Sequence, residues 1–143
     1  MFDCAVQEKS PYILIIDDDD DDVFLLMSIL KRVSREAGET IECGSVDNGV
    51  DALALVSLKR LLADLPVALI LDLNMPRLDG MGALKALRQS LGFGELPVFV
   101  LTTTANKDVH AAAMQLGATK TFVKPNSKSE LTDIAREILN TLH

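Results

Sequence analysis

Residues 12–18 read Tyr-Ile-Leu-Ile-Ile-Asp-Asp, an apolar run that ends abruptly in two carboxylates. The run does not alternate between apolar and polar residues, which is typical of a strand buried on both faces of a parallel sheet. Acidic side chains directly after such a strand lie at its carboxyl end, where open parallel sheets bind their ligands. The stretch therefore predicts a central strand and the edge of the sheet at which function is expected.

Four more short runs follow, and most of them are also apolar without alternation, although Glu42, Gly44 and Ser45 dilute the first of them. They cover residues 41–46, 67–71, 98–101 and 121–123. Between and after them apolar residues recur at helical spacing, as over residues 26–33. Gly38 and Gly117 stand where two helices are expected to end. Ser127 and Glu130 have the spacing of a capping box for the last helix. The alternation predicts a doubly wound α/β fold, with a five-stranded parallel sheet and five helices.

Length and charge limit the classes of function. The chain has 143 residues, which suits one domain, expected over residues 11–143 after a tail at 1–10. Its net charge of −7 argues against a nucleic-acid partner. The sequence contains no apolar run of transmembrane length, no signal-peptide pattern in the tail and no metal-binding cysteine spacing, so we expect a cytoplasmic protein without a membrane partner.

Polar side chains follow four of the five predicted strands. They are Asp17 and Asp18, Asp72 and Asn74, Thr102, and Lys124. Three carboxylates at one edge repel each other, and Mg²⁺, which prefers oxygen ligands, relieves the repulsion. Their charge of −3 is balanced by +2 from the metal and +1 from the lysine. A carboxylate can also act as a nucleophile toward phosphorus, and such transfer needs mainly positioning and neutralisation of charge.

Four segments resemble those of CheY-like response regulator receiver domains. They are residues 13–18 (ILIIDD), 71–80 (LDLNMPRLDG), 97–102 (PVFVLT) and 122–125 (FVKP). The resemblance covers residues 11–143 and implies the flavodoxin-like or CheY-like version of the fold. Two further segments, residues 21–25 (DDVFL) and 101–104 (LTTT), are similar to those of stand-alone regulators paired with phytochrome-type or hybrid sensor kinases.

The resemblance implies a metal site with four contributors. Asp72 is the phospho-acceptor and also a metal ligand. Asp18 binds Mg²⁺ directly, and Asp17 helps through a water molecule. Asn74 gives its backbone carbonyl to the metal.

The resemblance also implies how the phosphoryl group is held and sensed. Thr102 bonds a phosphoryl oxygen, and Lys124 pairs with the phosphoryl group, with a cis peptide bond to Pro125. Many relatives carry an aromatic residue three positions before the lysine, but Thr121 stands there and the aromatic residue is Phe122. Since Thr121 is too small to act as a rotor, we expect the response to depend on Thr102 and the loop after it, with little contribution from position 121.

The function implied is that of a single-domain response regulator. It accepts a phosphoryl group from a sensor histidine kinase or a phosphotransfer protein and changes conformation. It has no enzymatic activity beyond its own phosphorylation and dephosphorylation. With no effector domain expected, output falls to the face around residues 98–140, which pairs with itself as a homodimer or with an unknown downstream protein.

Three other functions share parts of the pattern. A phosphatase of the haloacid-dehalogenase type also uses a nucleophilic aspartate, but after its first strand, whereas Asp72 follows the third. A flavodoxin-like carrier needs a phosphate-binding loop where this chain has acidic residues, and a degenerate receiver needs no complete site. Residues 19–22 are expected only to cap the first helix and complement its dipole. His110, conceivable as a phospho-donor, is expected to be a solvated or packed histidine.

Overall fold

A computed structural model of the chain describes residues 11–73, 80–90 and 96–143. Within these residues five parallel strands form one sheet in the order β2-β1-β3-β4-β5. The strands are β1 (Tyr12–Ile16), β2 (Glu42–Val46), β3 (Ala68–Asp72), β4 (Val98–Thr102) and β5 (Lys120–Val123). Every predicted run forms a strand whose ends differ from the prediction by at most one residue, so the predicted five-stranded parallel sheet is confirmed.

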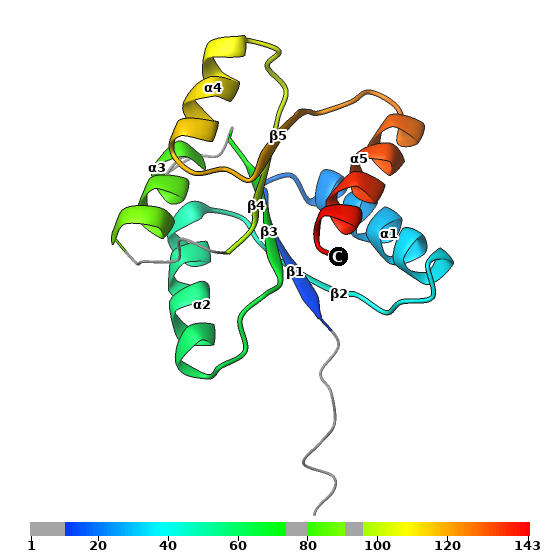
Figure 1. Cartoon of the computed structure of the whole chain (residues 1–143), viewed down its shortest axis with the longest axis horizontal. Helices are drawn as coiled ribbons and strands as arrows, with labels where there is room; N and C mark the ends of the chain where they lie inside the picture. The colour runs from blue at the N-terminus through cyan, green and yellow to red at the C-terminus, as the bar shows by residue number, and fades with distance from the viewer. Residues whose placement is uncertain (1–10, 74–79, 91–95) are drawn as a thin grey trace, which may run out of the picture.

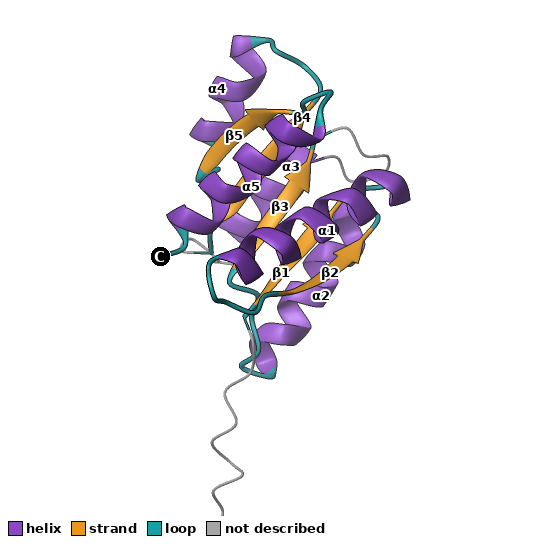
Figure 2. Cartoon of the chain, turned by 90° about the vertical axis from the view of Figure 1, so that its right-hand side faces the viewer, coloured by secondary structure: helices purple, strands orange, loops and turns teal. Residues whose placement is uncertain are grey.

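Helices cover both faces of the sheet. They are α1 (Asp20–Glu36), α2 (Gly49–Leu61), α3 (Gly80–Lys85) with a π-helical continuation (Ala86–Ser90), α4 (Lys107–Gln115) and α5 (Lys128–Thr141). Helices α1 and α5 lie on one face, and α2, α3 and α4 lie on the other (Figure 1; Figure 2). Strand order reverses between β1 and β3, which puts the binding edge of such a fold between their carboxyl ends. In the described part of the chain, no helix is both long and apolar enough to cross a bilayer.

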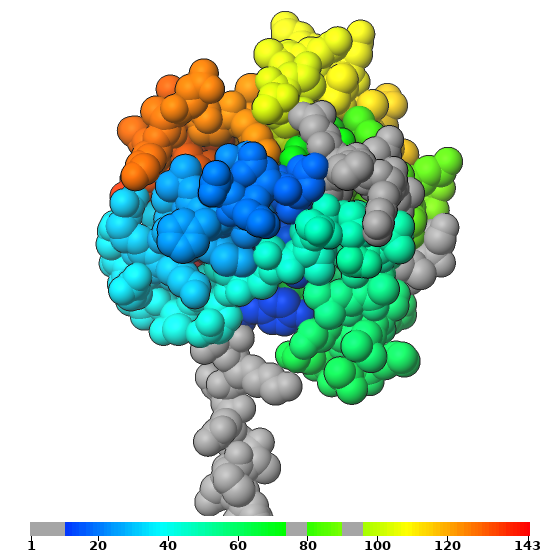
Figure 3. Space-filling model, turned by 180° about the vertical axis from the view of Figure 1, so that it is seen from behind, coloured from blue at the N-terminus to red at the C-terminus, as the bar shows by residue number. Residues whose placement is uncertain are grey.

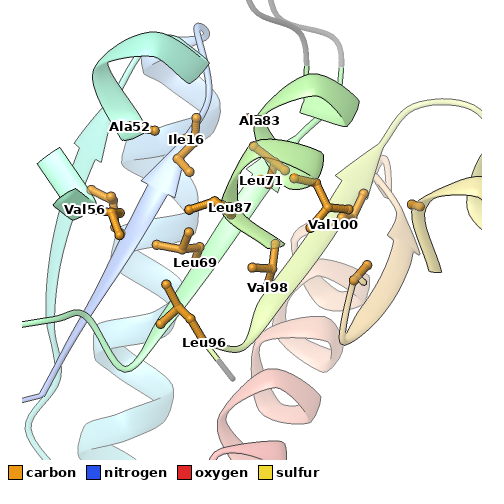
Figure 4. Close-up of a cluster of buried hydrophobic side chains, with 14 of the residues drawn as sticks. Ile16, Ala52, Val56, Leu69, Leu71, Ala83, Leu87, Leu96, Val98 and Val100 are labelled. Atoms are coloured by element: carbon orange, nitrogen blue, oxygen red, sulfur yellow. The ribbon is translucent and has the colours of Figure 1, made fainter. Parts of the chain in front are cut away.

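The core consists of two apolar layers, one on each face of the sheet. Because successive side chains of a strand point to opposite faces, β3 supplies Leu69 and Leu71 to the α2/α3/α4 layer and Ile70 to the α1/α5 layer. Figure 4 shows the first of these layers, in which Leu87 packs over Leu69 and Leu71. All residues of β3 and β4 are buried, as their unbroken apolar runs predict for central parallel strands.

Local signals fix the ends of the helices. Gly38 and Gly117 have φ of +78° and +108°, a left-handed conformation that glycine adopts without steric cost, and both follow helices as expected. Ser127 Oγ accepts a hydrogen bond from the Glu130 amide at 3.2 Å, which is the N-cap half of the predicted capping box. Asp19 caps α1 in the same way, through the amides of the first turn.

Candidate functional site

The register of the central strands brings two carboxylates to the same level. Ile16 pairs with Leu71, so the next residue of each strand, Asp17 and Asp72, stands at the carboxyl edge. Both side chains belong to residues that are only 6% and 5% exposed. Burying two neighbouring anions is costly unless cations meet them.

Asp18 completes a cluster of three carboxylates. One carboxylate oxygen from each of Asp17, Asp18 and Asp72 lies within 4.8 Å of the others. Asp17 and Asp72 are buried, whereas Asp18 is exposed. Three hard oxygen donors at this separation suit Mg²⁺, which binds one or two carboxylates and completes its octahedron with water or phosphate oxygens.

The acidic run of residues 17–22 divides between two tasks. Asp17 Oδ1 accepts a hydrogen bond from the Asp19 amide at 3.0 Å, which turns the chain from β1 toward α1. Asp19 Oδ1 then accepts from the amides of Asp21 and Asp22 at 3.0 and 3.2 Å, as the N-cap of the helix. The prediction that the run caps α1 is therefore confirmed, but capping does not account for all of it.

Lys124 forms ion pairs with three carboxylates of the site. Its Nζ lies 3.1 Å from Asp17 Oδ2, 3.3 Å from Asp72 Oδ2 and 3.2 Å from Asp22 Oδ2. The lysine side chain is 17% exposed, so its ion pairs with the buried Asp17 and Asp72 are largely shielded from water, whereas Asp22 is half exposed. Sequence reasoning missed Asp22, which it assigned to the helix dipole; the available signal was its place in the first turn of a helix that starts at the binding edge.

The pKa values of the central groups reflect this crowding. Burial, with a smaller contribution from Asp72, raises the pKa of Asp17 to about 6, although the Asp19 amide and Lys124 act to lower it. Burial alone would lower the pKa of Lys124, but the carboxylates of Asp17 and Asp72 outweigh burial and raise it. The lysine is therefore a permanent cation, while burial disfavours the charged form of Asp17.

The peptide bond before Pro125 differs from the expectation. It is trans, like every other peptide bond in the described residues, so the cis bond implied by the resemblance is wrong for this structure. Trans is the lower-energy form of an X–Pro bond by about 0.5–1 kcal/mol. Lys124 reaches Asp17, Asp22 and Asp72 with the trans bond, so these ion pairs do not require the cis form.

Thr102 lies at the end of β4, next to the acidic cluster. Asp72 pairs in register with Leu101, the residue before Thr102. Thr102 is fully buried, its Oγ1 accepts from the Thr104 amide at 3.3 Å, and its carbonyl accepts from the Lys124 amide at 2.7 Å. Asn74, the fourth expected contributor to the metal site, lies outside the described residues.

Gly80 lies close against the backbone of Asp72 and Leu73. A Cβ at this position would lie 2.7 Å from the Asp72 carbonyl oxygen and 2.6 Å from Leu73 Cα, distances at which backbone would have to move. In the sequence alone, Asp79-Gly80 is only a turn signal. The structure adds that α3 begins directly against the backbone of Asp72, an approach that only glycine permits.

A cavity of about 530 Å³ opens beside the site, between α1 and the start of α5. Asp17, Asp22 and Lys124 line its inner end, and Leu25 and Leu131 line its apolar walls. In the space-filling view the start of α1 (blue) lies beside the segment that follows β5 (orange) (Figure 3). The buried ion pairs are therefore reachable from this side of the molecule.

Comparisons with known proteins agree on one family. The profile of the response regulator receiver domain matches residues 13–136. Response regulator MprA of Mycobacterium ulcerans (strain Agy99) is 36% identical over 110 residues, which make up 77% of this chain and 44% of that protein; the match thus spans less than half of the relative. The phosphorylated cyanobacterial phytochrome response regulator RcpA has the same fold, with a TM-score of 0.81, 24% identity and 94% of each chain covered. The Mn²⁺-bound form of response regulator Rcp1 aligns with a TM-score of 0.72 and 26% identity, over 90% of this chain and 91% of its own.

Proposed function

This chain belongs to the response regulator receiver domain family, and from that premise we propose that it accepts a phosphoryl group on Asp72 in a Mg²⁺-dependent reaction. The observation that carries the proposal is the position of Asp72. It is buried at the carboxyl end of the central strand, within a cluster of three carboxylates and in contact with Lys124. A nucleophile, a cation site and a fixed ammonium group meet there, which is the set that phosphoryl transfer to a carboxylate needs.

In the proposed reaction one carboxylate oxygen of Asp72 forms a bond to phosphorus, and the bond between phosphorus and the donor breaks. The donor's histidine nitrogen, or the acetate of acetyl phosphate, leaves with the electron pair. Lys124 moves from its carboxylate partners to the incoming phosphoryl oxygens. The Thr102 hydroxyl donates a hydrogen bond to another of these oxygens. Asp17, Asp18 and Asp72, with Asn74 as a proposed fourth contributor, would hold Mg²⁺, which would supply positive charge to the transferring group.

Family membership and the position of the acceptor argue against the alternative functions. In the haloacid-dehalogenase type of phosphatase the nucleophile follows the first strand, whereas Asp72 ends β3 in the middle of the sheet. A flavin phosphate would meet the carboxylates of Asp17 and Asp18 after β1, which would repel it. A degenerate receiver would lack part of the site, but the acidic cluster and Lys124 come together here.

The proposed donor is a sensor histidine kinase or a phosphotransfer protein in the cytoplasm. We propose that residues 11–143 act as the receiver domain after a tail of residues 1–10, with no activity beyond self-phosphorylation and self-dephosphorylation. Output is proposed to pass through the face around residues 98–140, either to a second copy or to a separate protein. Light scattering with and without phosphorylation distinguishes these two: a doubled mass indicates self-pairing, and an unchanged mass at high concentration indicates a separate partner.

Incubation with acetyl phosphate and Mg²⁺ tests the proposal. Mass spectrometry should find one added phosphoryl group on the wild type and none on Asp72→Asn or on protein kept in chelator. Asp133→Asn is the matched control. Asp133 is 75% exposed on α5, so this substitution removes the same charge at a position outside the site. Labelling of Asp72→Asn at the wild-type level would refute the assignment of the acceptor.

A further inference from the structure

His110 bonds to two segments that come from different parts of the chain. Its ring nitrogen Nε2 lies 2.9 Å from the carbonyl oxygen of Thr104, in the loop between β4 and α4. Its other ring nitrogen, Nδ1, lies 2.8 Å from the hydroxyl oxygen of Thr121, on β5. One half-buried imidazole on α4 thus joins the helix, the loop before it and the neighbouring strand.

The hydrogen-bond partners of the ring determine which of its nitrogens carries the hydrogen. A backbone carbonyl can only accept, so Nε2 must carry the hydrogen that it donates to Thr104. In the neutral ring Nδ1 is then an acceptor, and the Thr121 hydroxyl donates to it. The neutral ring satisfies both of its nitrogens in this arrangement, so it makes two directed hydrogen bonds rather than a loose contact.

This pair of hydrogen bonds continues to the phosphoryl site. The residue whose carbonyl accepts from His110 also donates its amide to Thr102 Oγ1, at 3.3 Å. Thr102 is the buried hydroxyl residue next to the acidic cluster. A chain of contacts therefore runs from Thr102 through Thr104 and His110 to Thr121, on the face of the sheet that α4 covers.

We propose that His110 is a positioning residue that holds the loop after β4, and with it Thr102, in the unphosphorylated arrangement. The inference rests on the proposed function. The Thr102 hydroxyl can donate to a phosphoryl oxygen while it still accepts from the Thr104 amide, so a movement of Thr102 toward the site pulls Thr104 with it. The loop can then move only if the His110–Thr104 or the His110–Thr121 bond breaks. The hydroxyl of Thr121, rather than its size, places this residue in the response, which revises the expectation that position 121 contributes little.

The two hydrogen bonds of His110, to Thr104 and Thr121, should lower the affinity of the protein for a phosphoryl mimic. If the two bonds of His110 favour the arrangement without phosphate, their removal raises the fraction of the protein that is ready to bind, and the apparent affinity rises by the same factor. One net hydrogen bond corresponds to about a fivefold change in this equilibrium. We therefore expect His110→Phe and Thr121→Val each to bind beryllofluoride about fivefold more tightly in the presence of Mg²⁺.

The variants distinguish loss of the His110 hydrogen bonds from a nonspecific disturbance of the fold. His110→Phe keeps a ring without nitrogen atoms, and Thr121→Val keeps the branched shape without the hydroxyl. Thr121→Ser retains the hydroxyl and should restore an affinity close to that of the wild type. The double variant should bind no more tightly than either single one, because both changes remove the same link. His143→Phe, which removes a histidine paired with Glu39 elsewhere on the surface, should leave the affinity unchanged.

Calorimetric titration of the full chain with beryllofluoride and Mg²⁺ provides the affinities, and nitrogen NMR of the ring reports whether Nε2 carries the hydrogen. Failure of the wild type to bind beryllofluoride would overturn the proposed function and this inference with it. Binding by the wild type, with unchanged affinity in both His110→Phe and Thr121→Val, would overturn the inference alone. Additive effects in the double variant would also overturn it, because they would show two independent contributions. If His110→Phe does not fold, Thr121→Val and Thr121→Ser decide the question.

Discussion

Replacing Asp17 by asparagine should stabilise the metal-free protein. Asp17 is 6% exposed, and burial raises its pKa from the ordinary 3.8 to about 6. An acid whose pKa is raised by folding contributes stability below its unfolded pKa and loses that contribution as the pH rises toward its folded pKa. Between 3.8 and about 6 the loss accumulates at about 1.4 kcal/mol per pH unit, which gives at most about 3 kcal/mol at neutral pH.

The assay is urea unfolding in EDTA at several pH values. Asp17→Asn removes the charge but keeps an oxygen that can accept from the Asp19 amide. Its advantage over the wild type should be small near pH 4, grow up to about pH 6 and stay level above that. Addition of Mg²⁺ should then reverse the trend, because a cation at 100 times its dissociation constant stabilises the wild type by about 2.7 kcal/mol and the variant by less.

Asp18→Asn is the control within the same cluster, because the substitution removes the same charge from an exposed residue. It should change the stability in EDTA little, yet it should weaken the Mg²⁺ response more than the change at Asp17 does. The reasoning fails if Asp17→Asn is no more stable than the wild type in EDTA at pH 7. It also fails if the difference between the two proteins does not change with pH.

Three further outcomes follow from the geometry. Gly80→Ala should destabilise the fold by about 1–3 kcal/mol and slow phosphorylation of Asp72, because the new methyl group would meet the Asp72 carbonyl at 2.7 Å; equal unfolding midpoints in urea would contradict this. In a Cys4→Ser background, Cys43 should react with iodoacetamide at pH 8 roughly 100 times more slowly than a free thiol, because burial raises its pKa to about 11 from 9.0; a rate equal to that of the urea-unfolded chain would show that the thiol is accessible and ionised. Asp19→Ala should lower the free energy of unfolding by about 1 kcal/mol through loss of the N-cap of α1, whereas Asp19→Ser should keep most of that stability. Equal thermal unfolding temperatures for the wild type and Asp19→Ala would contradict this.

The fold and the candidate site differ in how far local sequence could predict them. Short apolar runs identified the strands, most clearly β1, β3 and β4, because a strand buried between two layers of helices has apolar neighbours on both faces. The edge strands β2 and β5 are partly exposed, and their runs are correspondingly less apolar or shorter. The same parallel arrangement carries the ends of β1 and β3 to one edge, so Asp17 and Asp72 could be expected to meet before any distance was known. Their proximity is now seen, while their roles in metal binding and phosphoryl transfer stay proposals.

Other features depend on contacts that no local pattern encodes. Lys124 and Asp22 are 102 residues apart, and their ion pair needs the start of α1 to lie beside the end of β5. Gly80 shows its purpose only once α3 is packed against the backbone of Asp72. The bonds of His110 to Thr104 and Thr121 likewise require one particular placement of α4 over β5.

By itself, the sequence determined the succession of strands and helices, the family and the residue types at the binding edge, because burial periodicity and strand direction are properties of short segments. Tertiary structure alone decided the third partner of Lys124, the trans bond that follows it and the link from Thr102 to Thr121. These depend on ångström-scale distances between side chains from separate elements, which arise only when the helices settle onto the sheet.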